Sequence, residues 1–152
     1  MKRIVSTLPY LAGLVLLCTT SCSLPRWNMK VDVDHPLRTD ALGIQIQEVL
    51  TGIGPGVTPD SEVTLDYQVS LENGDLVDSS YDRGLPITFR MGEAPILGWE
   101  HALLGMKSGG KRKATLPPYQ AYGKQGVEGL IPPMSILVCQ FELLEVADPR
   151  RP

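Results

Sequence analysis

The sequence predicts an α+β domain in which a largely antiparallel sheet of about five strands is covered on one face by one short helix. Residues 62–71, EVTLDYQVSL, alternate apolar and polar side chains, which is the pattern of a half-buried strand. Only residues 99–106 have the spacing of an amphipathic helix. Because strands and helices do not alternate along the chain, a parallel sheet is not expected.

Further strands are predicted at 43–50, 76–78, 87–91, 111–116 and 135–146. The dipeptide Asn73-Gly74 favours positive φ in a tight hairpin turn, so residues 76–78 are expected to return antiparallel to 62–71. In the helix, Trp99, Ala102, Leu103 and Met106 stand at i, i+3, i+4 and i+7, and Gly109-Gly110 is expected to end it.

The first 21 residues are typical of an export signal. Lys2 and Arg3 precede an apolar run over 8–17, which is shorter than the roughly 20 residues that a membrane span needs. The segment resembles a bacterial lipoprotein signal, in which the cysteine after the cleavage site becomes lipidated, and Cys22 is the candidate. Ordinary secretion with cleavage nearby is the alternative.

The expected organisation is therefore a signal peptide over 1–21, a flexible tether over 22–38 from lipidated Cys22, a folded domain over 39–147 and a tail over 148–152. The anchor would hold the protein in the bacterial cell envelope facing the periplasm, and Ser23 favours the outer membrane over the inner. Cleavage would change the net charge from −3 to −5, which disfavours nucleic acid as a partner. Cys139 would be the remaining thiol, so no internal disulfide is expected.

The sequence contains no convincing motif for phosphate or metal binding, because the candidate residues lack the neighbours that such sites need. Residues 105–111 match G-x-x-x-x-G-K, but Arg112 replaces the Ser or Thr that holds Mg²⁺ in a phosphate-binding loop, and this stretch runs from helix into strand. His35 and His101 are far apart and have no Cys or carboxylate at ligand spacing. Neither a metal nor a cofactor is expected.

Four segments resemble the FKBP-type peptidyl-prolyl cis/trans isomerases in sequence, order and spacing: VTLDYQVSLENGDLVDSS, PILGWEHALLGMKSGGKRKATLPP, AYG and GLIPP. The resemblance covers residues 43–146. It implies an antiparallel sheet wrapped around one short helix, which agrees with the elements predicted from periodicity.

The resemblance also implies an apolar pocket between helix and sheet, with Trp99 as its floor. Tyr122 would donate a hydrogen bond to the substrate carbonyl, and Asp78, steadied by the Tyr67 hydroxyl, would place negative charge near the carbonyl carbon. These three residues form the predicted catalytic set. The predicted substrate-binding set is Trp99, Ile96, Phe89, Val77, Ile87, Leu130, Ile131 and Cys139.

Each apolar member of this set could equally be an ordinary core residue. Asp78 and Tyr122 are more informative, because neither has a packing reason to stand where it does. The family often has phenylalanine where this chain has Val77, Ile87 and Cys139. Weaker catalysis and weaker macrolide binding are therefore expected.

The predicted function is peptidyl-prolyl isomerisation in the folding of envelope proteins. The alternative is a weakly catalytic or non-catalytic module that binds proline-containing segments at the membrane. The expected partners are unfolded or extended polypeptides that contain proline, and a macrolide inhibitor. A monomer is expected, because family members that dimerise use a long helical N-terminal extension, which about fifteen tether residues cannot supply.

Overall fold

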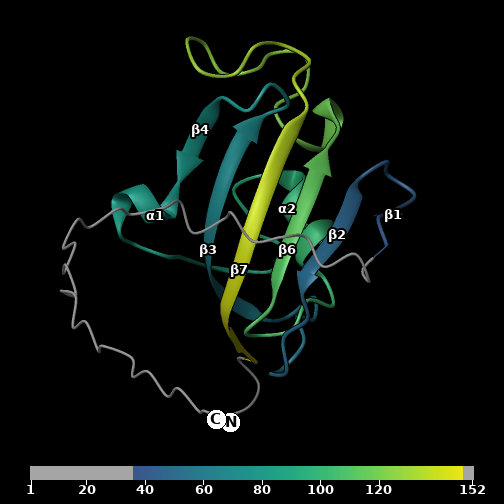
Figure 1. Ribbon diagram of the computed structural model, residues 1–152, viewed down its shortest axis with the longest axis vertical. Helices are drawn as coiled ribbons and strands as arrows, with labels where there is room; N and C mark the ends of the chain where they lie inside the picture. The colour runs from purple at the N-terminus through teal and green to yellow at the C-terminus, as the bar shows by residue number, and fades with distance from the viewer. Residues whose placement is uncertain (1–35, 149–152) are drawn as a thin grey trace, which may run out of the picture. The chain divides into compact units, whose positions relative to one another are not determined.

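The computed structural model describes residues 36–148. Seven strands form one antiparallel sheet: β1 (Arg38–Thr39), β2 (Gln45–Leu50), β3 (Glu62–Leu71), β4 (Leu76–Ser79), β5 (Ile87–Arg90), β6 (Lys111–Leu116) and β7 (Leu137–Ala147). Their order in the sheet is β1-β2-β6-β7-β3-β4, and β5 pairs with β3 outside this path (Figure 1). The predicted α+β class is confirmed, although the sequence predicted only about five strands and the structure has seven within the described residues.

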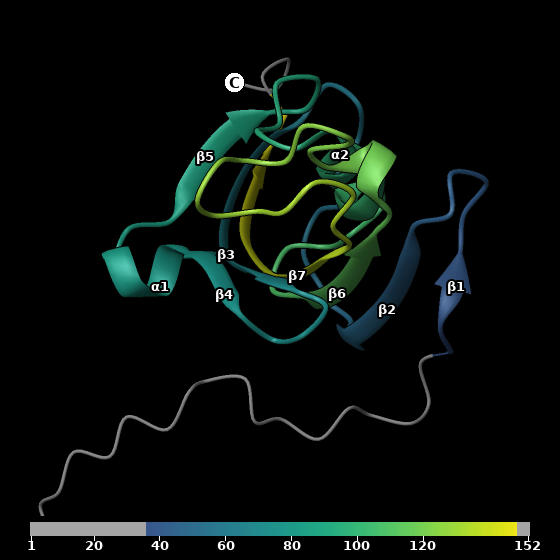
Figure 2. The same cartoon turned by 90° about the horizontal axis from the view of Figure 1, so that it is seen from above.

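The central pair, β3 and β7, carries the core face of the sheet. Leu65 pairs with Leu143, Tyr67 with Phe141 and Val69 with Cys139. All six side chains are buried. Because side chains alternate across a strand, they share the face that is turned toward the helix α2 (Leu97–Leu103). Seen from above, the strands form an arc that curves around α2 (Figure 2).

The helix α2 differs from its prediction at both ends. It begins two residues earlier and stops at Leu103, because Leu104 has ψ 130° and Gly105 has φ 73°, which glycine adopts without steric cost. The turn allows the Gly105 N–H to donate to Val57 O at 3.0 Å, and the Val57 N–H to donate to Met106 O at 2.9 Å. Met106 is buried by this turn and not by helical periodicity. The expectation that Gly109-Gly110 ends the helix is wrong.

A second helix, α1 (Ser80–Arg83), follows β4 and was not predicted. The Ser79 hydroxyl caps it by accepting from the Asp82 N–H at 3.3 Å, and Gly84 ends it with φ 65°. A 3-10 turn, η1 (Pro118–Gln120), follows β6. The stretch 104–110 connects α2 to β6 and therefore runs from helix into strand. A phosphate-binding loop runs from strand into helix, so this stretch is not one.

The predicted signal peptide, the lipidation site Cys22, most of the tether and most of the tail lie outside the described residues. Within 36–148, no helix is long and apolar enough to span a membrane. The same range contains no cluster of His, Cys, Asp or Glu that could hold a metal ion. The first strand already includes Arg38, whose guanidinium lies 3.8 Å from the Glu48 carboxylate.

Candidate active site

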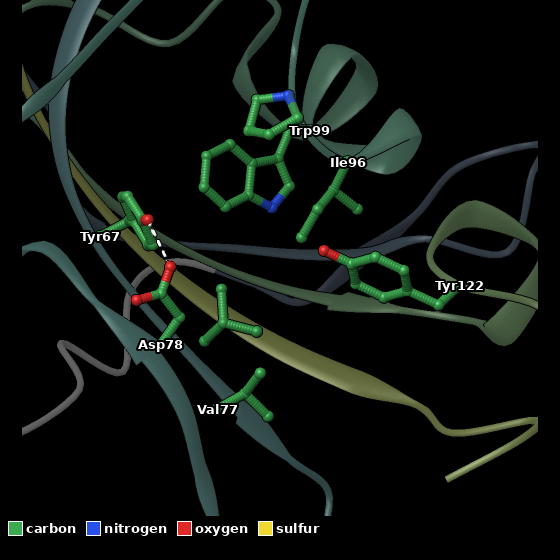
Figure 3. A pocket seen from close by; sticks show the side chains of 8 residues that line it. Tyr67, Val77, Asp78, Ile96, Trp99 and Tyr122 are labelled. Carbon is green, nitrogen blue, oxygen red and sulfur yellow. Dashed lines mark hydrogen bonds between the residues drawn. The ribbon is translucent and has the colours of Figure 1, made fainter. Parts of the chain in front are cut away.

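A pocket with an empty volume of about 310 Å³, its solvent mouth included, opens between α2 and the β3–β4 hairpin. Trp99 and Ile96 come from the start of α2, while Tyr67 and Asp78 face them from neighbouring strands (Figure 3). Tyr122 closes a further side from the segment after η1 (Figure 3). The full lining is Tyr67, Val69, Val77, Asp78, Pro95, Ile96, Trp99 and Tyr122.

The polar edge of the pocket is a hydrogen-bonded cluster around Asp78. The Tyr67 hydroxyl donates to Asp78 Oδ2 at 2.6 Å, and the Ser79 backbone N–H donates to Asp78 Oδ1 at 2.8 Å. Arg83 bridges the two side chains, because its guanidinium donates both to Asp78 Oδ1 and to the Tyr67 hydroxyl. The carboxylate is thereby held in one orientation while 42% of its side chain remains exposed.

Both tyrosines of the pocket stay protonated at neutral pH. Burial, followed by the hydrogen bond to Asp78, raises the pKa of Tyr67 above its ordinary value of 10.0. Burial also raises the pKa of Tyr122, and the negative charge of Asp78 adds to the effect. No hydrogen bond is recorded for the Tyr122 hydroxyl in the described residues, so it is an available O–H donor at the pocket wall.

The floor of the pocket is rigid. The Trp99 ring is 1% exposed and packs edge-on against Tyr67 at 4.8 Å and Phe141 at 5.1 Å between ring centroids. Its indole N–H makes no hydrogen bond of good geometry within 36–148, but it lies near enough to Cys139 to lower the pKa of that thiol somewhat. Burial has the larger effect and raises the pKa of Cys139 to about 12, so the thiol is unreactive at neutral pH.

Two contacts position the rim of the pocket. Glu100 Oε1 accepts from the Gly92 N–H at 2.8 Å and from the Ala94 N–H at 2.9 Å, which fixes the segment that leads into Pro95 and Ile96. Gly98 allows a close approach on the other side, because a Cβ there would lie 2.8 Å from Gln120 O. The chain that carries Tyr122 can therefore pass directly over the start of α2.

The pocket brings together six of the predicted site residues: Tyr67, Asp78, Tyr122, Trp99, Ile96 and Val77. Five others do not line it. Phe89 and Cys139 lie buried in the core beside the Trp99 ring, and Ile87 is partly buried at the start of β5. Leu130 and Ile131 line a separate groove, because the turn that carries them folds toward the tip of the β3–β4 hairpin.

Sequence reasoning missed three residues of the site. Val69 could have been found, since it follows Tyr67 by two positions on the same strand face. Pro95 directly precedes the predicted Ile96. Arg83 had no signal of its own, because its position beside Asp78 depends on the unpredicted helix α1.

Comparison with known proteins settles the family. The model of the FKBP-type peptidyl-prolyl cis-trans isomerase family matches residues 54–144. The chain belongs to this family. An FK506-binding protein of Neisseria meningitidis serogroup B is 41% identical over 105 residues, which is 68% of this chain and 96% of that protein. The FKBP-type isomerase FkpA of Escherichia coli K12 is 42% identical over 120 residues, which is 79% of this chain but only 44% of FkpA.

Solved structures of similar isomerases agree with this assignment. The crystal structure of Escherichia coli FkpA has a TM-score of 0.69 and 41% identity, covering 74% of this chain and 52% of that chain. A peptidyl-prolyl isomerase of Pseudomonas syringae has a TM-score of 0.67 and 34% identity, covering 73% of this chain and 80% of that chain. The predicted FKBP-type fold and peptidyl-prolyl isomerase activity are both confirmed at the level of the family.

Proposed function

We propose that this FKBP-type domain binds the proline ring of an X-Pro segment over Trp99, and that Tyr122 and Asp78 stabilise the twisted form of its amide bond. The observation that carries the proposal is the pairing of a rigid apolar floor with two polar groups at the pocket edge. Asp78 is held by Tyr67, Ser79 and Arg83, whereas the Tyr122 hydroxyl is an available donor.

The chemistry requires no covalent step. Amide resonance sets a rotation barrier of roughly 18 to 20 kcal/mol and makes uncatalysed X-Pro isomerisation slow. Rotation destroys that resonance and reduces the charge separation of the amide. An apolar pocket with few water molecules therefore favours the twisted state over the planar one.

The polar groups act on the same rotation. The Tyr122 O–H would donate to the substrate carbonyl, and the Asp78 carboxylate would supply fixed negative charge near the carbonyl carbon. A thousandfold acceleration needs only about 4 kcal/mol of differential stabilisation. Shape, desolvation and one or two oriented hydrogen bonds are sufficient for that amount.

The test measures isomerisation of a short X-Pro peptide by a chain that starts at Pro36, so that β1 is kept whole. Asp78→Ala and Tyr122→Phe should each lower kcat/KM by about tenfold or more, with little loss of stability. Tyr119→Phe is the matched control, because Tyr119 is a neighbouring tyrosine that is 67% exposed and lies outside the pocket lining. Wild-type turnover in both site variants would show that these residue roles are wrong.

We further propose that the enzyme works on exported proteins in the bacterial envelope, anchored through lipidated Cys22. The basic start, the apolar run and the small residues before this cysteine support the proposal. Cys22→Ser should release the protein from membranes or block its processing, while Cys18→Ser should not. An unmodified N-terminus on a soluble wild-type protein would contradict the anchor.

A macrolide inhibitor would occupy the same pocket, and the domain would act as a monomer. The relative from Neisseria meningitidis is named for FK506 binding, which supports the first point. Because Val77 offers less apolar surface than an aromatic side chain, we expect weak macrolide binding. Competition of such a macrolide with the X-Pro peptide, and the mass of the protein in solution, test these two points.

A further inference from the structure

A second hollow lies beside the proline pocket and takes no part in the proposed chemistry. It is an open groove with an empty volume of about 840 Å³, its mouth included, between the tip of the β3–β4 hairpin and the turn at 125–133. In Figure 1 this turn is part of the yellow-green loop that stands above the hairpin. The lining is Leu71, Asp75, Gln125, Val127, Glu128, Gly129, Leu130, Ile131, Pro132 and Pro133.

The groove continues the proline pocket along the same two strands. On β3, Tyr67 and Val69 line the pocket and Leu71 lines the groove. Val77 on β4 lines the pocket, and Asp75, in the turn directly before β4, lines the groove. Residues two apart on a strand are about 6 to 7 Å apart, and a substrate in extended conformation has the same spacing. This spacing would let a side chain within two positions of a bound proline reach the groove.

Both walls of the groove are formed without a ligand. On the loop side, Val127 and Ile131 exchange two backbone hydrogen bonds of 2.8 Å. Gly126, with φ 62°, permits this turn, since a Cβ there would lie 2.2 Å from Ile131 O. On the hairpin side, the Leu71 N–H donates to Asp75 O at 2.8 Å. A substrate side chain would thus enter a prepared site and not order a loose one.

The charges of the groove have one sign. Asp75 and Glu128 stand on opposite walls, and the lining contains no Lys or Arg. Asp75 accepts a hydrogen bond from the neutral side chain of Asn73 at 2.7 Å. Because the partner carries no charge, this contact does not neutralise the carboxylate. Within the described residues Glu128 has no recorded hydrogen bond or ion pair. Asp78 in the pocket differs, because Arg83 pairs with it.

We infer that this groove is a specificity subsite for a lysine or arginine within two positions of the substrate proline. The aliphatic stem of such a side chain would pack on Leu71, Leu130 and Ile131 while its cationic head lies between Asp75 and Glu128. The inference rests on the proposed function, since the proline in the pocket determines which side chain enters the groove. The preferred substrates are then proline segments with a basic neighbour.

The experiment uses peptides with one proline and a variable residue one or two positions before or after it. That residue is lysine, norleucine or glutamate, and norleucine keeps the four-carbon stem of lysine without its charge. With the full-chain protein at low salt, we expect kcat/KM to be about fivefold higher for lysine than for glutamate at the best position. The contrast should shrink when the ionic strength is raised.

The double variant Asp75→Asn, Glu128→Gln should lower kcat/KM for the lysine peptide and raise it for the glutamate peptide, so that their ratio approaches one. The double variant Glu62→Gln, Glu145→Gln is the matched control, because it also removes two exposed negative charges, at the other end of β3 from Leu71. This control should leave the ratio unchanged. A purely structural effect of the double variant Asp75→Asn, Glu128→Gln would change kcat/KM by the same factor for all peptides and would leave the ratio of lysine to glutamate peptide unchanged.

Three outcomes overturn the subsite. Equal kcat/KM for lysine and glutamate in the wild type is the first, and a ratio that survives in the double variant is the second. The third is a ratio that falls equally in the control variant Glu62→Gln, Glu145→Gln, which would reveal only the general field of an acidic protein. Each of these leaves turnover of the norleucine peptide intact, whereas failure of the proposed function would appear as no turnover of any peptide.

Discussion

The structure contains two arginine–carboxylate clusters, one between β2 and β6 and one between β4 and α1. They differ mainly in their exposure to water. Arg112, whose side chain is 5% exposed, pairs with Glu48 and donates to the carbonyl oxygens of Ala102 and Leu104 at the end of α2. Arg83, whose side chain is 49% exposed, pairs with Asp78 at the pocket edge. The same chemical pair therefore holds a helix in place in one cluster and orients a site carboxylate in the other.

The comparison teaches that burial decides which property such a pair controls. Removal of one partner from a buried pair leaves the other charge without solvent or partner, which is strongly destabilising. Solvent screens an exposed pair, so its removal changes stability little and acts mainly on the geometry of neighbouring groups.

The largest expected effect is on stability. Arg112→Met should lower the free energy of unfolding by about 3 kcal/mol or more, because Glu48 and two helix carbonyls lose their donor. Urea unfolding measures it. Arg38→Met is the matched control, since Arg38 approaches the same Glu48 at 3.8 Å but is 69% exposed, and it should cost less than about 1 kcal/mol. A loss below about 1 kcal/mol in Arg112→Met would show that burial of this ion pair does not make it more important for stability than an exposed pair.

The next effect is on the pocket beside the exposed cluster. Val77→Phe should raise kcat/KM about tenfold, because an aromatic ring would add apolar contact worth on the order of 1 to 2 kcal/mol at about 25 cal/mol per Å². Thermal stability must be measured in parallel, since a ring that overpacks the site would destabilise the protein instead. Unchanged stability without a gain in kcat/KM would mean that Val77 does not touch the substrate.

A smaller effect is expected at Arg83. Arg83→Gln should leave the urea midpoint close to that of the wild type, because this pair is exposed to solvent. It should lower kcat/KM several-fold, since Asp78 and the Tyr67 hydroxyl lose the group that bridges them. Arg90→Gln, at an exposed position on β5, controls for loss of a positive charge. A large loss of stability at Arg83 would remove the difference between the clusters.

The smallest effect is expected from pH. Burial raises the pKa of Tyr122 above 10.0, so its protonated donor form persists to at least that pH. The value of kcat/KM should therefore stay flat from about pH 6 to about pH 9 and fall only at higher pH, as Tyr122 loses its proton. A decline with an apparent pKa near 8 would contradict the role of Tyr122 as a hydrogen-bond donor.

The pattern of residues along the chain predicted most of the strands and the chemical type of the site. Strand β3 was predicted residue for residue, because ten alternating positions leave one way to bury an apolar face. Six of the eleven predicted site residues line one pocket. These include Asp78 and Tyr122, and a carboxylate and a tyrosine at those positions have no packing role that would explain them.

The end of the helix and the set of apolar side chains that line the pocket depend on three-dimensional packing. Met106 fits helical periodicity but is buried by a turn, since periodicity records burial and not the path of the chain that achieves it. Cys139 and Phe89 lie in the core beside the Trp99 ring, while Leu130 and Ile131 line the neighbouring groove. Arg83 reaches Asp78 through the short helix α1. These contacts are made between residues on different helices, strands and loops. Local patterns in the sequence do not show how such elements pack against one another.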